Sequence, residues 1–317
     1  RDTGEYQKAL PLQQRALRIA ETSSGENHPD TAMSLNNLAL LLSNMGQLDA
    51  ALDYYQRALR INEEAQGAEH PATGNQLSNL AMLYRDMGLY EEALPLMRRA
   101  LHISETSEGS WHPHTAASLN NLALLYSVLG HDDEAVALSE RALHIVEATY
   151  GADGHPSIAL YLNNLAAQYN KLGREVDTLP MLIRAFQISV QHAYDTIGLI
   201  RAHQSLSSYH AISGDSALAI YFGKQAVNGL QALRSGLRDL DQDLQRGFLA
   251  KNEDAYHHLA GLLIDAGRLA EAQQVTAMLK EQELFELIQR DAQADPRTTR
   301  LSLTGQEQAF ADQYEAI

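Results

Sequence analysis

The chain has 317 residues, of which 45% are hydrophobic, and its 40 acidic and 24 basic residues give a formal net charge of −16. This acidic balance argues against nucleic acid or an anionic membrane as the main partner, and no apolar run approaches the roughly 18 residues of a membrane span. The sequence contains no cysteine, so it offers neither a disulfide framework nor a thiolate nucleophile. These features lead us to expect a cytoplasmic protein.

The sequence repeats itself with a period of about 42 residues. The dipeptide His-Pro occurs at His28, His70, His112 and His155, with spacings of 42, 42 and 43 residues. Each copy continues into an asparagine-containing apolar segment, "SLNNLALLLSNMG" in the first copy, and in most copies alanines stand five and twelve residues after its glycine. A fixed period of this length predicts an array of stacked helical or mixed repeats.

Each repeat predicts two helices. Leu35, Leu38, Ala39 and Leu42 lie at the i, i+3, i+4 and i+7 positions of an amphipathic helix, and a second apolar face follows the glycine. Glycine suits the left-handed residue that ends a helix, and proline after histidine suits the first helical position. We expect a partial first repeat and then repeats starting near residues 28, 70, 112, 155 and 196, so that residues 1–228 form one solenoid.

One repeat shows the full pattern of leucine, small residue, aromatic residue, glycine and two alanines seven apart, at Leu80, Ala81, Tyr84, Gly88, Ala93 and Ala100. In this pattern residues 4–228 resemble the tetratricopeptide repeat, in the 42-residue form found in kinesin light chains. The resemblance implies an all-α, right-handed superhelical solenoid of antiparallel helix hairpins. Thr178 and Ser205 depart from the pattern in the later repeats.

In the tetratricopeptide family the first helix of each repeat lines the concave face of the superhelix. By resemblance, one asparagine per repeat belongs to a peptide-binding face: Asn37, Asn79, Asn121 and Asn164. A neutral amide offers donors and an acceptor, so a ladder of amides could hold the N–H and C=O groups of an extended peptide. Alternatively, these amides bond to the neighbouring repeat, and both roles can coexist. The preceding residues Asn36, Asn120 and Asn163 turn toward the adjacent repeat, which favours a structural role.

An apolar strip of Leu40, Met82, Leu124 and Ala167 runs between the amides, and Arg85, Asp86 and Lys171 are the main charges on this face. Relatives that clamp a terminal carboxylate or an acidic peptide present several basic residues here, so we do not expect that preference. The candidate peptide-binding residues are Asn37, Asn44, Asn75, Asn79, Asn121, Asn164, Leu40, Met82, Leu124, Arg85 and Lys171.

The repeated histidines do not predict a metal site. Equivalent positions of successive hairpins are at least one helix packing distance apart, roughly 8–10 Å, whereas zinc ligands lie about 2 Å from the ion. We interpret these histidines as turn residues and Trp111 as local packing. No HExxH, GxSxG or GxxxxGK[ST] string occurs. We therefore expect no cofactor, no metal and no catalytic residue in this chain.

The repeat register weakens from about Gly229. We expect residues 229–294 to form a degenerate last repeat, turning at Gly267, and capping helices, and residues 295–317 to form a connector. Thr304 and Glu307 have the spacing of a capping box that opens a further helix. Five apolar residues are placed to cover the last repeat: Leu259, Leu263, Leu279, Leu284 and Phe285.

The segment from "LLIDAGRLAEAQQVTAMLKEQELFELIQRD" through "DPRTTRLSLTG" resembles the helical connector of bacterial proteins that couple tetratricopeptide repeats to a CHAT domain, a caspase-like cysteine protease fold. The resemblance implies a His/Cys protease module beyond this chain, which could contact it intramolecularly. Because the chain starts inside a repeat and without methionine, we expect it to be a fragment of a larger protein.

The sequence thus predicts a scaffold that binds a protein or extended peptide, the sensing or regulatory arm of a bacterial CHAT-type protease, with no nucleic-acid or membrane partner. A sensor region of a signalling ATPase or transcriptional regulator is the alternative within the binding class. An enzyme in its own right is the remote alternative.

Overall fold

The fold is taken from a computed structural model. It describes residues 6–151, 155–192, 196–236, 242–288 and 300–314. All regular secondary structure in these residues is helical, and the chain divides into two compact units, an N-terminal unit (Tyr6–Leu172) and a C-terminal unit (Gly173–Ile317). Among the described helices, none combines the length and apolarity needed to cross a membrane.

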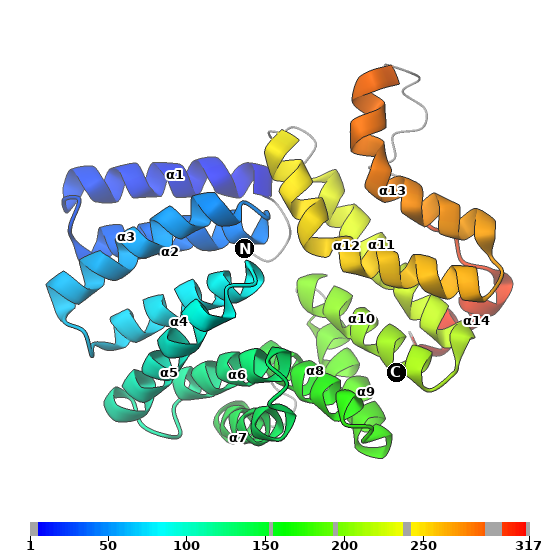
Figure 1. The fold of residues 1–317 in the computed structure, drawn as a ribbon, viewed down its shortest axis with the longest axis horizontal. Helices are drawn as coiled ribbons and strands as arrows, with labels where there is room; N and C mark the ends of the chain where they lie inside the picture. Colours follow the sequence, from blue (N-terminus) through cyan, green and yellow to red (C-terminus); the bar gives the residue numbers. More distant parts are fainter. Residues whose placement is uncertain (1–5, 152–154, 193–195, 237–241, 289–299, 315–317) are drawn as a thin grey trace. The chain divides into compact units, whose positions relative to one another are not determined.

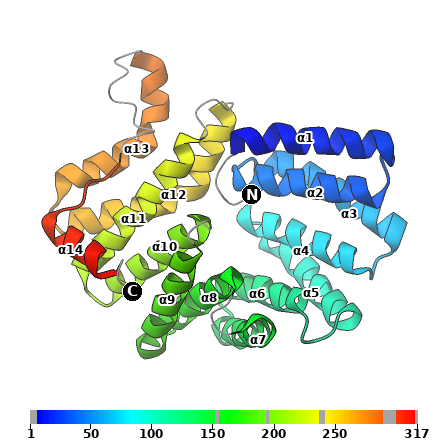
Figure 2. The ribbon, with the colours of Figure 1, turned by 180° about the vertical axis from the view of Figure 1, so that it is seen from behind.

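The N-terminal unit is a series of helical hairpins (Figure 1; Figure 2). Its helices are α1 (Tyr6–Ser23), α2 (Pro29–Asn44), α3 (Leu48–Gln66), α4 (Pro71–Asp86), α5 (Tyr90–Ser107), α6 (Pro113–Val128), α7 (Asp132–Tyr150) and α8 (Pro156–Lys171). Helices α2 and α3, α4 and α5, and α6 and α7 pair within hairpins, while α1 packs against α2 and α8 against α7. The repeated sequence blocks therefore coincide with the hairpins.

Glycine ends the first helix of each hairpin. Gly46 has a φ of 79° and Gly88 a φ of 77°, in the left-handed region that other residues adopt only with strain. The amide of Gln47, just after the first of these turns, donates to the Leu42 carbonyl at 2.9 Å, which closes the helix end. The sequence expectation for these glycines is confirmed.

The His-Pro pairs cap the start of each first helix. His70 adopts an extended backbone, its Nδ1 accepts from the Ala72 amide at 3.2 Å, and proline follows at the first helical position. Thr73 fixes the same turn, because its hydroxyl donates to the Gly67 carbonyl at 2.8 Å. His28, His112 and His155 accept in the same way from Asp30, His114 and Ser157. The histidine is thus a helix N-cap as well as a turn residue.

Successive hairpins of the N-terminal unit are joined by contacts that repeat with the sequence. On the second helices, the ion pairs Arg57–Glu21, Arg99–Glu63 and Arg141–Glu105 each have an N–O distance of 2.8 Å. Between a second helix and the next first helix, a tyrosine hydroxyl bonds to a polar side chain in the pairs Gln56–Tyr84, Arg98–Tyr126 and Glu140–Tyr169. Alanines such as Ala39, Ala51 and Ala58 are fully buried, which lets the helices approach closely.

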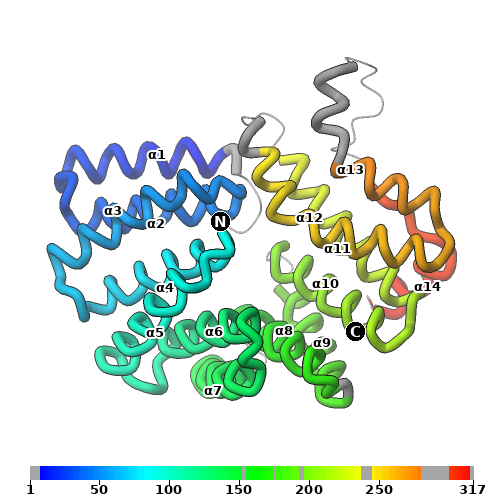
Figure 3. Tube along the Cα trace, in the orientation of Figure 1, coloured from blue at the N-terminus to red at the C-terminus, as the bar shows by residue number. Residues whose placement is uncertain are grey.

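The C-terminal unit continues the hairpin pattern (Figure 3). It contains α9 (Glu175–Gln191), α10 (Thr196–Ile212), α11 (Ser216–Ser235), α12 (Gln242–Asp265), α13 (Leu269–Ile288) and α14 (Gly305–Tyr314). Helix α9 packs against α10, α10 pairs with α11, and α12 pairs with α13. Leu259 and Leu263 of α12 are fully buried and Leu279 is half-buried, whereas the side chains of Leu284 and Phe285 lie outside the described residues.

The last helix, α14, packs against α11 through a buried ion cluster. Lys224 of α11 is fully buried, and its Nζ lies 2.9 Å from Glu307 Oε2 and 2.6 Å from Glu271 Oε2. It also donates to the Ser302 carbonyl at 2.8 Å, while Arg268 Nη1 lies 2.8 Å from Glu307 Oε1. Two basic and two acidic side chains are therefore paired where α11, α13 and α14 meet.

The predicted capping box at the start of α14 is confirmed. The Thr304 amide donates to Glu307 Oε2 at 2.7 Å, and the Glu307 amide donates to Thr304 Oγ1 at 3.3 Å. Glu307 therefore serves both the helix start and the ion cluster. The remaining parts of the expected connector, residues 295–299 and 315–317, lie outside the described residues.

Candidate functional site

The first helices of the N-terminal unit, α2, α4, α6 and α8, form a continuous row, because α2 contacts α4, α4 contacts α6 and α6 contacts α8. We call the side of this row that carries the candidate asparagines the first-helix face. Asn37, Asn79, Asn121 and Asn164 all stand nine residues before the turn glycine of their hairpin, and all four are half-buried. The regular hairpin geometry therefore brings the four predicted amides into the same register.

Three of these amides bond to the preceding first helix. The Nδ2 group of Asn79 donates to Asn36 Oδ1 at 2.8 Å, that of Asn164 donates to Asn120 Oδ1 at 2.9 Å, and that of Asn121 donates to the Ser78 hydroxyl at 3.0 Å. The residue before each asparagine thus accepts from the next repeat. This geometry supports the structural role that the sequence left open beside the peptide-binding role.

The same bonds leave part of each amide available. An amide has two N–H donors and a carbonyl oxygen, and the bond of Asn79, Asn121 or Asn164 to the preceding repeat uses one donor. Within the described residues no other protein group bonds to these three side chains, and Asn37 makes no side-chain hydrogen bond at all. The two roles are therefore compatible in this structure.

The preceding asparagines behave as expected in two of three repeats. Asn36 and Asn120 accept from the next repeat, and Asn120 is 4% exposed. Asn163 instead donates to the Ala159 carbonyl of its own helix at 2.9 Å. It is buried, and its Oδ1 has no partner among the described residues.

The apolar strip is graded in exposure. Leu40 is 46% exposed and Ala167 is also exposed, whereas Met82 and Leu124 are half-buried. Met82 packs against the core around Leu122. The strip therefore offers accessible apolar surface mainly near α2 and α8, with a shallower contribution from α4 and α6.

The two predicted cations of this face are already paired. Arg85 Nη2 lies 2.7 Å from the Asp86 carboxylate, and Lys171 Nζ lies 2.6 Å from the Asp132 carboxylate and donates to the Ser127 carbonyl at 2.7 Å. Asn44 and Asn75 are exposed, with no hydrogen bond from their side chains to described residues. The face consequently presents amides and apolar groups rather than free positive charge.

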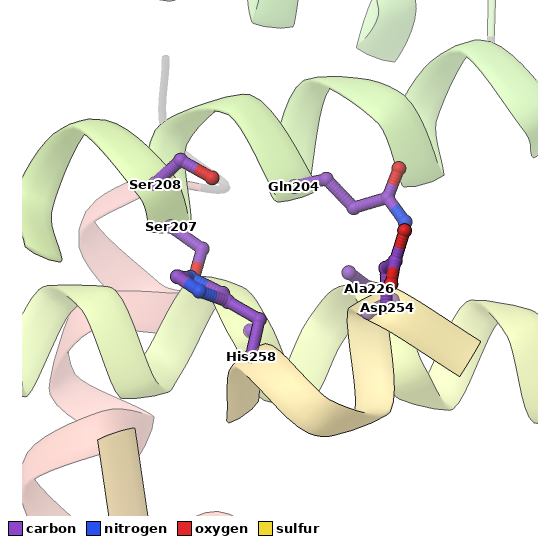
Figure 4. Close-up of a pocket in the computed structure, with 8 residues that line it drawn as sticks. Gln204, Ser207, Ser208, Ala226, Asp254 and His258 are labelled. Atoms are coloured by element: carbon purple, nitrogen blue, oxygen red, sulfur yellow. The ribbon is translucent and has the colours of Figure 1, made fainter. Parts of the chain in front are cut away.

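The C-terminal unit contains a pocket that the sequence did not predict. A cavity of about 280 Å³ lies between α10, α11 and α12, with Gln204 and Ser208 on one side and Asp254 and His258 on the other (Figure 4). Figure 4 shows the Gln204 and Asp254 side chains pointing toward one another, and His258 pointing toward Ser207. Polar side chains therefore face one another across the pocket from α10 and α12.

Ser207 and His258 are not arranged as a nucleophile and its base. The Ser207 hydroxyl donates to the Ala219 carbonyl at 2.8 Å, and Ser207 Oγ lies 3.2 Å from His258 Nε2. Because the hydroxyl proton already has an acceptor, His258 Nε2 is the donor of the second bond. Burial lowers the pKa of His258 below its usual value, which favours the neutral ring. The pair holds α10 and α12 together.

The pocket lies where the asparagine contact would be. Counted back from the turn glycines Gly214 and Gly267, Gln204 has the register of Asn36 and His258 has the register of Asn37. In the N-terminal unit residues at these two registers bond between successive first helices, but His258 bonds to Ser207 instead. Gln204 and His258 therefore do not make the bond that the asparagines make at these registers, and the pocket lies between them.

The sequence profile of the tetratricopeptide repeat matches residues 1–64, 35–105 and 72–148. This part of the chain is a tetratricopeptide-repeat array. The hairpins of paired helices, the turn glycines and the buried alanines carry the same pattern, so the predicted all-α tetratricopeptide solenoid is confirmed.

Solved structures agree on the fold. BtubC (BKLC) from P. vanneervenii has a TM-score of 0.55 and 21% identity, over 74% of this chain and 93% of that chain. A Rap protein complexed with competence and sporulation factor has a TM-score of 0.65 and 18% identity, over 90% and 72%. The apo form of RapI has a TM-score of 0.58 and 18% identity, over 88% and 98%. No curated protein matches the chain.

Sequence reasoning located the amides of the tetratricopeptide array but missed two other polar clusters. The pocket at Gln204 and His258 could have been found only by following the repeat register past the point where the asparagines disappear. A cluster of Glu108, His112 and His114 in the α5–α6 turn could hold a metal ion. Its three ligands belong to one turn, so the spacing between repeats does not reveal it.

Proposed function

We propose that the first-helix face of this tetratricopeptide array binds an extended segment of a protein partner. The proposal rests on one observation, which is that the asparagines of this face use only part of their hydrogen-bonding capacity within the protein. Each of three amides is held in place by one bond to the preceding repeat and keeps a donor and an acceptor that no described residue uses. A side chain fixed in this way loses little conformational freedom when a ligand bonds to it.

The chemistry of the face favours recognition of the peptide backbone. Amides match the N–H and C=O groups that every peptide presents, and the exposed apolar surface at Leu40 can accept an apolar side chain. Arg85 and Lys171 are neutralised by their carboxylate partners. The partner segment is therefore expected to be extended and apolar or uncharged rather than acidic.

Peptides selected from a random display library against the full chain would test this proposal. For a selected twelve-residue peptide, N-methylation of single backbone amides should weaken binding at alternate positions, because each methyl group removes a donor. Alanine substitution of most polar side chains should have little effect. Binding that ignores backbone methylation but depends on charged side chains of the peptide would contradict the proposal.

The finer proposal is that the array is the sensing or regulatory arm of a CHAT-type protease. Its support is the resemblance of the connector segment, of which residues 289–299 lie outside the described part of the chain. The coding sequence that adjoins this chain provides the test. A caspase-like module with a His/Cys pair is the expected result, whereas an ATPase or DNA-binding module would favour the alternative regulators.

We do not propose catalysis by this chain. Support comes from the direction of the Ser207–His258 bond, in which the imidazole donates rather than accepts. The chain alone should hydrolyse neither peptide nor ester substrates. Activity that disappears in Ser207→Ala and persists in a Ser213→Ala control would contradict this statement.

A further inference from the structure

We propose that Glu108, His112 and His114 form a binding site for a divalent transition-metal ion of the zinc class. Glu108 and His112 lie in the turn between α5 and α6, and His114 lies in the first turn of α6, apart from the first-helix asparagines. His114 Nδ1 lies 2.6 Å from Glu108 Oε1, and His112 Nδ1 lies 3.5 Å from Glu108 Oε2. One ligand atom from each of the three residues lies within 4.8 Å of the other two.

These separations are close to those of a coordinated set. Ligands about 2.0–2.1 Å from a tetrahedral zinc ion lie roughly 3.3 Å from one another. The side chains of Glu108, His112 and His114 are 16%, 40% and 51% exposed, so small rotations can bring the three atoms together. Two imidazoles and one carboxylate suit zinc, copper and nickel ions better than calcium or magnesium, and the remaining position is open to water.

The combination is specific to this turn. In the equivalent turns, the residue two positions after the capping histidine is Asp30, Ala72 or Ser157, so the second imidazole is missing. The residue four positions before the capping histidine is Ser24, Gln66 or Gly151 rather than glutamate. Among these four turns, only this one therefore combines the capping histidine with a glutamate and a second histidine.

Metal binding would replace contacts that the ligand atoms now make with one another and with the helix start. The short contact between His114 Nδ1 and Glu108 Oε1, at 2.6 Å, would give way to two bonds to the ion. His112 Nδ1 accepts from the His114 amide at 3.3 Å, which is longer than the usual 2.9–3.0 Å or so of such bonds. The start of α6 carries partial positive charge, and the Glu108 carboxylate supplies the negative charge that offsets it at the ion. The helix retains Pro113 at its first position and the Thr115 hydroxyl bond to the Gly109 carbonyl, so the turn stays closed.

The only tryptophan of the chain, Trp111, stands beside His112 and is 63% exposed. Its ring packs edge-on against His144, with 5.3 Å between ring centroids. Tryptophan fluorescence therefore reports on this turn alone. Titration of untagged, chelator-treated full chain with zinc chloride should change the fluorescence and show one ion per chain by calorimetry. Copper chloride should quench the same signal.

Two variants and one control test whether these residues bind the zinc ion. Glu108→Gln and His114→Ala should each weaken zinc affinity by at least about tenfold, since removing a residue that only hydrogen-bonds to a metal ligand already costs about 10–100-fold. His131→Ala removes an exposed histidine that faces Glu134 at 4.0 Å, and should leave affinity unchanged. Melting curves confirm that each variant is folded. Absence of zinc uptake by the native chain, or equal affinity of the native chain and the two variants, would overturn the proposal.

Discussion

The two units of this protein build helical hairpins with the same turns but join them with different polar chemistry. In the N-terminal unit, neutral amides at one register link each first helix to the next, as in the Asn79–Asn36 bond. In the C-terminal unit Gln204 and His258 occupy the registers of Asn36 and Asn37, a pocket lies between their helices, and a buried ion cluster around Lys224 attaches the last helix. Regular repeats thus distribute polar contacts evenly, whereas the C-terminal unit gathers the ion pairs of the buried Lys224 in one cluster.

The difference has an energetic consequence. A hydrogen bond between neutral groups contributes about 0.5–1.5 kcal/mol, so no single amide bond dominates the stability of the N-terminal unit. Removing one member of a buried ion cluster leaves its partners without compensation and costs about 3–5 kcal/mol. The C-terminal unit should therefore be far more sensitive to single substitutions of polar residues.

Lys224→Met should have the largest effect. The substitution keeps an apolar stem of similar length but leaves Glu271 and Glu307 without the buried ammonium, and should destabilise the C-terminal unit by about 3–5 kcal/mol. Circular dichroism should show an early unfolding phase, while the fluorescence of Trp111, which lies in the N-terminal unit, should report an unchanged transition. As a matched control, Lys171→Met breaks an exposed pair and should cost less than about 1 kcal/mol. Equal costs for the two substitutions would remove the contrast between the units.

Acid should act on the same cluster. Burial alone would raise the pKa of Glu307, but hydrogen bonds from Arg268, the Thr304 amide and Lys224 outweigh burial and hold the pKa below the ordinary value of 4.5. The pKa of Glu271 is lowered in the same way by Arg268 and Lys224, against its burial. A carboxylate with a depressed pKa stabilises the folded state above the unfolded pKa, and this contribution is lost as the pH falls through the folded value. The C-terminal unit should therefore lose stability below about pH 4.5.

Melting curves between pH 7 and pH 3 measure this dependence. Glu307→Gln should flatten the pH dependence of the melting temperature of the C-terminal unit, because the amide does not titrate. Glu134→Gln, which changes an exposed glutamate of the N-terminal unit, should not alter it. A Glu307→Gln curve that runs parallel to the native curve would show that the cluster does not govern acid stability.

The smallest effects should come from the ion pairs between second helices. Arg99 and Glu63 are each about one-third exposed, so Arg99→Ala should lower stability by no more than about 1 kcal/mol, and less in high salt. Denaturant unfolding followed by Trp111 fluorescence measures this change. A loss of several kcal/mol would mean that the N-terminal unit also depends on individual charges.

The features that could be predicted from the sequence are those that are local or that recur with the repeat. Hairpins, turn glycines and first-helix amides recur with the repeat, so local periodicity specified Gly46, Leu35 and Asn79 without knowledge of the packing. The Thr304–Glu307 capping box was predictable because its two residues are three positions apart. Local and repeated interactions leave a pattern that can be read along the chain.

The remaining features depend on partners that are distant and occur once. Lys224 meets Glu271 and Glu307 across long stretches of sequence, and nothing in the local pattern marks it as buried. The choice between the Asn79–Asn36 contact and a ligand contact also needs coordinates, because a helical wheel gives a direction but not the reach of a neighbouring side chain. The pocket at His258 lies where the bond between successive first helices is missing, and no sequence motif indicates a missing bond.

Binding by the first-helix face is tested most directly by comparing Asn37→Ala with Asn79→Ala. Both substitutions remove an amide from the face, but only Asn79 donates to a neighbouring repeat. Asn79→Ala should lower the free energy of unfolding by about 0.5–1.5 kcal/mol, and Asn37→Ala should leave it unchanged. Both should weaken binding of the selected twelve-residue peptide by about two- to tenfold, measured by calorimetry on the folded protein. Native affinity in Asn37→Ala, together with lower stability in Asn79→Ala, would show that the amides serve the solenoid alone and would contradict the account.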